Sequence, residues 1–301
     1  MLNVFYDPRQ VADQPGHTSP SSGKPKAVVA EWNRRGFPIK IREISPVTEE
    51  DFSLAHDSKF VHDILNCQLE NGFGNTNEYV AASLPWTTGS LWSAARAVMT
   101  EDISVACSPT SGFHHACWDK CGGFCTFNGL MVTALLLKKH ELVNKVGILD
   151  LDHHWGNGTA DIINALSIDW LYHYTIGGES IKFQQLNALD KTGAEVFMER
   201  LPSICAAYQG CDVVLYQAGA DLWENDPFAW NGGLSVAQLK KRDEIVFSSF
   251  HAMGIPCVWN LAGGYVRDEH GTIQPVLDIH NNTAQACIES YGLNEVESVQ
   301  W

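Results

Sequence analysis

The chain has 301 residues, of which 45% are hydrophobic and 18% are charged, so it can bury a sizeable core and is neither disordered nor fibrous. Its 35 acidic residues outnumber its 20 basic ones and give a formal net charge of −15. A surface this acidic repels phosphate backbones and anionic lipid heads. We therefore expect no nucleic-acid partner and no membrane partner, whereas a cationic or lysine-bearing substrate is acceptable.

The amino-terminal segment and the cysteines indicate the compartment. Residues 1–10 have no basic region ahead of their short apolar run, unlike a signal peptide, and no stretch approaches the length of a membrane-spanning helix. The nine cysteines are odd in number and scattered along the chain. We expect a cytoplasmic protein with reduced thiols and no disulfide framework.

Short apolar runs alternate with longer helix-like segments along the chain. In chain order, the runs predict strands at Leu2–Tyr6, Pro38–Ile44, Ile103–Cys107, Val146–Leu151, Ile168–Tyr174, Asp212–Gln217 and Pro256–Leu261. Helices are predicted at Leu91–Met99, Asn128–His140 and Gln238–Ala252, and a long loop at Asp13–Lys26. Together these predict an α/β fold in a single domain, residues 1–301, with a mainly parallel sheet flanked by helices. Such sheets bind ligands at the carboxyl ends of their strands.

Polar side chains follow two of these predicted strands. Asp152 and His154 are two positions apart, so on an extended segment both point to the same face. They are either a buried hydrogen-bonded pair or two of the three protein ligands of a catalytic zinc. Asp221 follows the strand at Asp212–Gln217, where it is either a helix N-cap or the third ligand. An Asp-His-Asp set suits zinc but also iron(II) or cobalt(II), so it does not fix the metal.

Two further segments carry titratable side chains. His114 and His115 are either a solvated pair or a general acid/base pair, because unperturbed histidine titrates near neutrality. Tyr265 follows two glycines at the end of the last predicted strand. It is either packed in a turn or directs its hydroxyl at a developing oxyanion.

The order of these motifs resembles the histone deacetylase family and its bacterial relatives, the acetylpolyamine amidohydrolases and acetoin-utilisation proteins of the arginase/deacetylase fold. The motifs are His114-His115, Gly122–Asn128, Asp150–Gly158, Gly219–Asp221 and Gly263–Tyr265. The resemblance covers nearly the whole chain and implies one parallel sheet of about eight strands. It also implies that Asp152, His154 and Asp221 hold a zinc ion. A structural potassium ion is implied near the backbone carbonyls of Asp150, Asp152 and His154.

The resemblance assigns the remaining catalytic roles. His114 and His115 would be the tandem catalytic pair, with Asp150 orienting His114, and Tyr265 would stabilise the oxyanion. Asn157 stands beside His115 where many members carry Asp, as in the class II branch. Loss of that charge lowers the basicity of His115, which favours His115 as the acid of the pair.

The resemblance also outlines a substrate tunnel. Gly123 and Phe124 would line it, and Phe228 takes the rim position where polyamine-selective relatives can carry an acid. An aromatic side chain there argues against long polyamines, although Glu224 and Asp226 lie near enough in sequence to bind an ammonium group.

The implied activity is that of a zinc-dependent amidohydrolase, an enzyme that removes acetyl or other acyl groups from lysine side chains or related acylated amines. An acetylpolyamine amidohydrolase and a non-catalytic acyl-lysine binding protein are the alternatives. Trp155, next to His154, is expected to reshape the surroundings of the metal. A second zinc site at Cys117, Cys121 and Cys125 is disfavoured by their spacing. The sequence makes no prediction of the oligomeric state.

Overall fold

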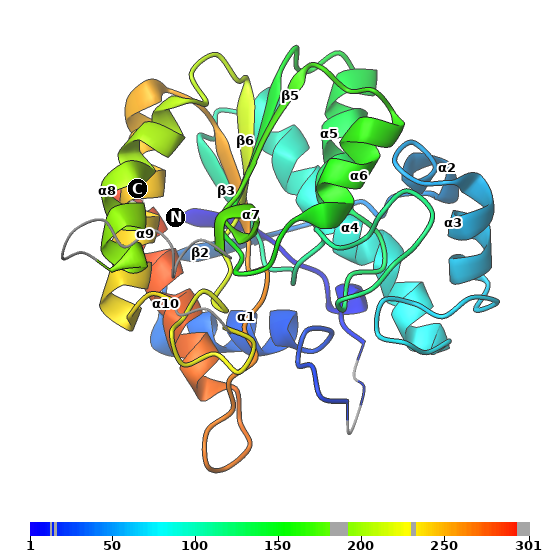
Figure 1. Ribbon diagram of the computed structural model, residues 1–301, viewed down its shortest axis with the longest axis horizontal. Coiled ribbons are helices and arrows are strands. Elements are labelled where there is room, and N and C mark those ends of the chain that lie inside the picture. Colours follow the sequence, from blue (N-terminus) through cyan, green and yellow to red (C-terminus); the bar gives the residue numbers. More distant parts are fainter. Residues whose placement is uncertain (13, 15–16, 181–191, 230–232, 294–301) are drawn as a thin grey trace, which may run out of the picture.

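A computed structural model describes residues 1–12, 14, 17–180, 192–229 and 233–293. Within them, seven parallel strands form one sheet in the order β2-β1-β3-β7-β6-β4-β5 (Figure 1). The strands are β1 (Leu2–Phe5), β2 (Ile39–Arg42), β3 (Val105–Ser108), β4 (Val146–Asp150), β5 (Leu171–Thr175), β6 (Val213–Gln217) and β7 (Cys257–Asn260). Each apolar run identified in the sequence forms one of these strands, which confirms the parallel α/β fold. The described residues have seven strands where the resemblance implied about eight.

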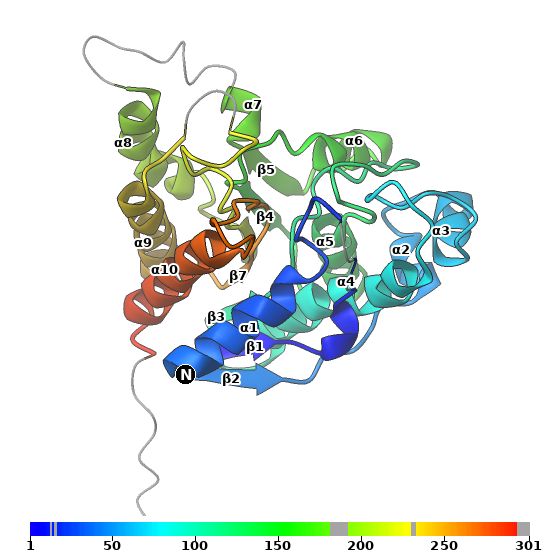
Figure 2. The same cartoon turned by 90° about the horizontal axis from the view of Figure 1, so that it is seen from below.

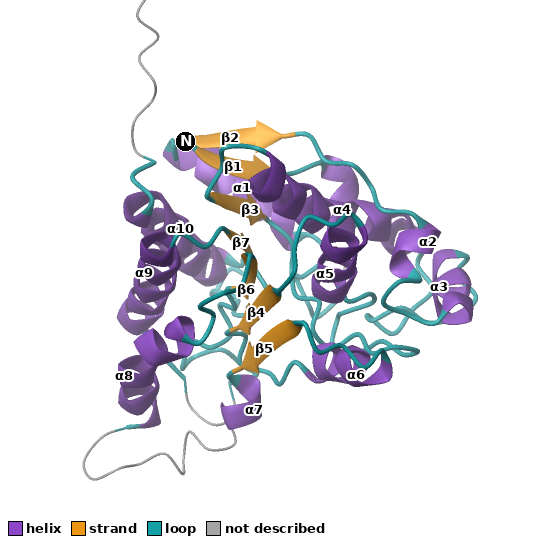
Figure 3. Cartoon of the chain, turned by 90° about the horizontal axis from the view of Figure 1, so that it is seen from above, coloured by secondary structure: helices purple, strands orange, loops and turns teal. Residues whose placement is uncertain are grey.

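Helices cover both faces of this sheet. They are α1 (Lys24–Arg35), α2 (Glu49–Phe52), α3 (Ser58–Leu65), α4 (Glu78–Thr100), α5 (Gly129–Lys139), α6 (Asn157–Ala165), α7 (Gly177–Ser180), α8 (Gly193–Ala206), α9 (Val236–Met253) and α10 (Gln274–Ser290), with a 3-10 turn η1 at Pro8–Gln10. Figures 2 and 3 show α8, α9 and α10 on one side of the strands and α4, α5 and α6 on the other. No helix in the described part of the chain combines the length and the apolar character needed to cross a membrane.

The sheet separates two hydrophobic cores. On β6, Val214 and Tyr216 belong to the core under α8, α9 and α10, whereas Val213 and Leu215 belong to the core under α4 and α5. This alternation follows from the period of two along a strand. It explains why the strand sequences are apolar at every position and do not alternate with polar residues.

Two helix boundaries differ from the expectation. The loop expected at Asp13–Lys26 ends earlier, because α1 begins at Lys24 after the Gly23 cap. Residues 13, 15 and 16 of that loop lie outside the described residues. Helix α4 begins at Glu78, well before the predicted Leu91, and contains Pro85. Its first half has a proline and several residues of low helix propensity, so tertiary packing decides its conformation.

The register of three central strands fixes where their polar ends meet. Asp150 at the end of β4 lies opposite Gln217 at the end of β6, which in turn lies opposite Asn260 at the end of β7. Since the strands are parallel, the segments that follow them emerge side by side at one edge of the sheet. These segments carry Asp152, Asp221 and Tyr265.

Candidate metal and catalytic site

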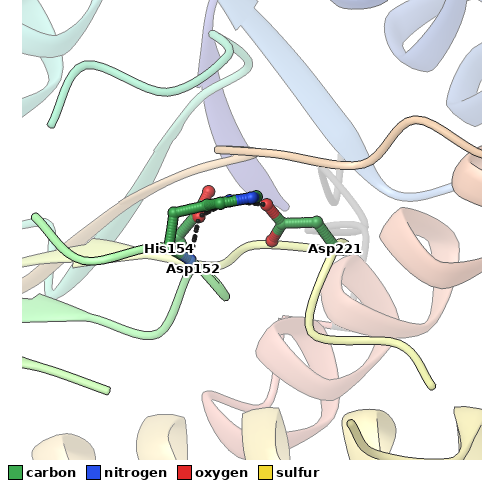
Figure 4. A group of neighbouring side chains, drawn as sticks. All are labelled: Asp152, His154 and Asp221. Carbon is green, nitrogen blue, oxygen red and sulfur yellow. Dashed lines mark hydrogen bonds and ion pairs between the residues drawn. The ribbon is translucent and has the colours of Figure 1, made fainter. Parts of the chain in front are cut away.

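Three side chains converge beyond the ends of β4 and β6. Asp152, His154 and Asp221 each offer a donor atom, and these atoms all lie within 4.8 Å of one another (Figure 4). The Nδ1 atom of His154 is 3.1 Å from Asp152 Oδ1 and 3.1 Å from Asp221 Oδ2. The convergence expected from the sequence is therefore present. In the described part of the chain, it is the one such group of three His, Cys, Asp or Glu donors.

Backbone amides hold the two carboxylates in place. Asp152 Oδ2 accepts a hydrogen bond from Gly263 N at 2.8 Å, and Asp221 Oδ1 accepts one from His153 N at 3.1 Å. The other oxygen of each carboxylate, Asp152 Oδ1 or Asp221 Oδ2, lies next to His154 Nδ1 in the cluster. Both carboxylates are buried, whereas the His154 side chain is 21% exposed, so the cluster is reached from solvent past His154.

The donor set fits a divalent cation. Burial and the neighbouring Asp152 carboxylate raise the pKa of Asp221, because two buried anions repel each other. Burial alone would lower the pKa of His154, but its hydrogen bonds to Asp152 and Asp221 raise it to about 11. The residues therefore create a negative, partly desolvated site of two oxygens and one nitrogen, which matches the number of protein ligands in a catalytic zinc site and also suits iron(II) or cobalt(II).

The two tandem histidines have different partners. His114 Nδ1 lies 2.7 Å from Asp150 Oδ2, and its Nε2 lies 3.5 Å from Asp152 Oδ1. His115 Nδ1 lies 2.7 Å from Asn157 Oδ1. Because an amide oxygen only accepts, His115 donates from Nδ1 and leaves Nε2 as its basic nitrogen. The rings are adjacent, with centroids 4.1 Å apart.

These partners separate the basicities of the two rings. Burial lowers the pKa of His114, but the charges of Asp150 and Asp152 outweigh burial and raise it to about 9. Burial and the neighbouring His114 lower the pKa of His115 to about 4. The lowered pKa of His115 has the direction expected from the sequence, but burial and His114 cause it, and the hydrogen bond to Asn157 acts in the opposite direction. However, a neutral His115 is a proton acceptor near pH 7, so these directions favour the opposite acid/base division from the one the sequence favoured.

A large segment of the chain matches a known domain family. Residues 21–168 match the model of the histone deacetylase domain. This segment belongs to the histone deacetylase domain family. The matched segment contains the histidine pair and two of the three candidate ligands, and Asp221 and Tyr265 lie beyond it.

Relatives of this deacetylase domain include enzymes named for two substrate classes. Histone deacetylase 2 of Arabidopsis thaliana is 27% identical over 192 residues, which cover 60% of this chain and 48% of the relative. The acetylpolyamine amidohydrolase of Mycoplana ramosa is 27% identical over 236 residues, covering 66% of this chain and 65% of the relative. The chain thus spans about half of the one and less than two thirds of the other. The crystal structure of the HDA15 HD domain shares the fold, with a TM-score of 0.73 at 21% identity over 99% of this chain and 90% of the other.

Aromatic side chains surround the candidate site. The Tyr265 ring lies 5.7 Å from that of Phe124 and 4.9 Å from that of Phe228, centroid to centroid. Phe228 also lies 6.4 Å from the His154 ring. Gly123 adopts φ +55°, and a Cβ atom there would lie 2.4 Å from His115 Cδ2, so only glycine lets the chain pass the His115 ring.

Two expectations about neighbouring residues need correction. Trp155 is 54% exposed, so it faces solvent at the rim and does not pack around the metal ligands. Asp226 is buried and uses both carboxylate oxygens, which accept hydrogen bonds from Tyr265 N and Phe228 N. It is therefore not available for a substrate ammonium group, whereas Glu224 is exposed. The alternation of strand and loop could not show this, because one of the two partners of Asp226, Tyr265, lies on a distant loop.

Two buried residues of the site were not predicted from the sequence. Gln217 donates from Nε2 to Asp150 Oδ1 at 3.0 Å and accepts from Phe113 N at 3.0 Å, so it ties Asp150 to the segment that carries His114. Its signal was a polar residue at the end of a buried strand. Lys24 is fully buried and donates to the carbonyl of Ala262 at 2.5 Å, and burial lowers its pKa to about 8.

Proposed function

We propose that this protein is a zinc-dependent amidohydrolase that removes acetyl or other acyl groups from lysine side chains. The observation that carries the proposal is the placement of three metal-binding donors beside a histidine pair whose members have different basicities. Membership of the histone deacetylase domain family supports deacetylase activity. Iron(II) or cobalt(II) in place of zinc is compatible with the same donors.

In the proposed mechanism, each residue of the site has a separate role. Asp152, His154 and Asp221 would hold a divalent metal, which would supply Lewis-acid polarisation of the amide carbonyl and of a water molecule. His115, oriented through Asn157, accepts the water proton at Nε2. His114, kept protonated by Asp150, provides positive charge beside it and a proton for the leaving amine.

Tyr265 is the proposed oxyanion donor. Burial and the nearby Asp221 and Asp152 charges raise the pKa of the Tyr265 phenol above its ordinary value, so it keeps its proton at neutral pH. Asp226 accepts a hydrogen bond from the Tyr265 backbone amide, which fixes the position of the backbone from which the phenol extends. A fixed hydroxyl aimed at the developing negative charge is an effective stabiliser because it does not reorganise during the reaction.

The tunnel walls favour an acylated lysine over an acylated polyamine. Phe124 and Phe228 offer flat apolar surfaces to the methylene chain of a lysine. The buried acid of this loop, Asp226, already has two backbone donors. An acetylpolyamine amidohydrolase is the second candidate, supported by the relative that bears this name and by the exposed Glu224.

The test compares substrates and metals together. We expect kcat/KM for an acetyl-lysine peptide to exceed that for N-acetylputrescine and acetylspermidine, with one equivalent of zinc bound and inhibition by a hydroxamate. Preference for the acetylpolyamines would favour the second candidate. A chain that binds zinc but hydrolyses none of these amides would contradict the proposal.

The remaining proposals concern the setting of the enzyme. We propose a class II-like member acting as one catalytic domain over residues 1–301 in the cytoplasm, with a structural potassium ion at the carbonyls of Asp150, Asp152 and His154. Asn157 in the Gly-Asn-Gly segment supports the class assignment. The net charge of −15 supports acylated lysine or amine substrates without nucleic-acid or membrane partners.

A further inference from the structure

Arg242 is a buried cation beneath the metal site. It lies on α9 with no exposed surface, and a buried guanidinium is unfavourable unless its charge and its donors find partners. Nothing in the mechanism above uses it. Its contacts therefore need an explanation of their own.

One nitrogen of Arg242 contacts both chain segments that carry the carboxylate ligands. Nη1 donates to the carbonyl oxygen of Gly219 at 2.7 Å and lies 3.3 Å from that of Leu151. Leu151 directly precedes Asp152, and Gly219 is two residues before Asp221. The contact lies just beyond the sheet, since Leu151 N still donates to Gln217 O at 3.0 Å. Arg242 thus bridges the two segments where they leave β4 and β6.

The guanidinium is itself held by a buried network. Arg242 Nε donates to Asp243 Oδ1 at 2.8 Å. The same carboxylate accepts from the Tyr216 hydroxyl at 2.5 Å and from the Thr283 hydroxyl at 2.6 Å. These partners come from β6 and α10. The position of Arg242 is therefore set by three elements packed under the site, and Asp243 compensates its charge.

We propose that Arg242 is a positioning residue for the metal site, which holds the Asp152 and Asp221 segments at the separation that one cation requires. The inference rests on the proposed metal-dependent function. A single donor shared between two carbonyls couples the segments, so loss of the donor lets each move separately. Ligand geometry tolerates only small displacements, and partners outside the ligand shell typically change metal affinity by about 10- to 100-fold.

The experiment measures metal binding by Arg242 variants. Arg242→Met leaves the buried Asp243 carboxylate without a cation to compensate its charge, which by itself destabilises the fold, so the double variant Arg242→Met/Asp243→Asn is measured with it. We expect both to bind Zn²⁺ about 10- to 100-fold more weakly in competition with a chromogenic chelator. We also expect an altered visible absorption spectrum of the Co²⁺-substituted protein. Arg242→Lys retains a charge without the planar fork and should give an intermediate affinity.

A matched control separates positioning from stability. Val246→Ala removes two buried methyl groups one turn away on the same helix and lowers stability by the cavity it creates. It should leave the zinc dissociation constant and the cobalt spectrum unchanged. A folded double variant with wild-type zinc affinity and a wild-type cobalt spectrum would overturn the inference alone. A wild-type chain that binds no zinc would overturn both this inference and the proposed function.

Discussion

Gly263 provides the sharpest test of the metal site, because its missing side chain leaves room for the ligands. A Cβ atom at this position would lie 2.0 Å from Asp221 Oδ2 and 2.8 Å from Asp152 Oδ2. Carbon and oxygen atoms in contact need roughly 3.5 Å, so Gly263→Ala must displace the Asp221 carboxylate by more than about 1 Å. Metal ligands tolerate about 0.2 Å. We expect zinc affinity to fall by at least ~10²-fold, the upper range for loss of an outer partner.

The assay is zinc binding by competition with a chelator, with circular dichroism and thermal unfolding of the metal-free protein to establish folding. Gly122→Ala is the control, because nothing lies within 4 Å of a Cβ atom there and its φ is not positive. It should bind zinc as the wild type does. If folded Gly263→Ala also bound zinc with wild-type affinity, the carboxylates beside Gly263 would not be metal ligands.

Three further predictions concern titratable groups. His56 is buried between the carbonyl of Cys117 and the amide of Asn128, and burial lowers its pKa to about 4. As pH falls, His56 therefore takes up a proton in the unfolded chain before it does so in the folded protein. About 3 kcal/mol of folding free energy should be lost as pH falls from about 6.5 to 4. In urea unfolding, the stability of His56→Gln should depend less on pH. Asp150→Asn should lower the pKa of His114 from about 9, read by NMR titration, and slow hydrolysis about 10²-fold; an unmoved titration would contradict the assigned pair. Tyr265→Phe should keep zinc but lose ~10² to 10³-fold in rate, and unchanged turnover of acetyl-lysine would require another oxyanion donor.

The sequence predicted the parts of this site that depend on local pattern. Runs that are apolar at every position marked the buried strands, and the carboxyl ends of parallel strands lie at one edge by geometry alone. The strand pattern and the motif order were therefore enough to place Asp152, His154 and Asp221 together. The predicted strand at Asp212–Gln217 agrees with β6, and the second half of α4 agrees with the predicted helix.

Residues whose roles come from distant partners were not predictable in this way. Gln217, Asp226 and Arg242 each contact chain segments at least 39 positions away in sequence. Their residue types suit many ordinary roles, such as a strand end, an exposed loop or a helix surface. Tertiary packing determines which of those roles each residue has, and the periodicity and spacing of the sequence do not indicate it.

The buried charges of the site give a physical reason for a divalent cation. The buried carboxylates around it belong to Asp150, Asp152, Asp221, Asp226 and Asp243. The buried cations are Lys24, Arg242 and, when protonated, His114. With these groups ionised and His154 neutral, the form in which it binds a metal, two negative charges remain uncompensated in a region of low dielectric, which is unfavourable without a counter-ion. The only cluster of donors that the described residues offer to such an ion is Asp152, His154 and Asp221. A dication there neutralises the site without an additional side chain and takes the place of the proton that His154, with its pKa raised to about 11, holds in the metal-free protein.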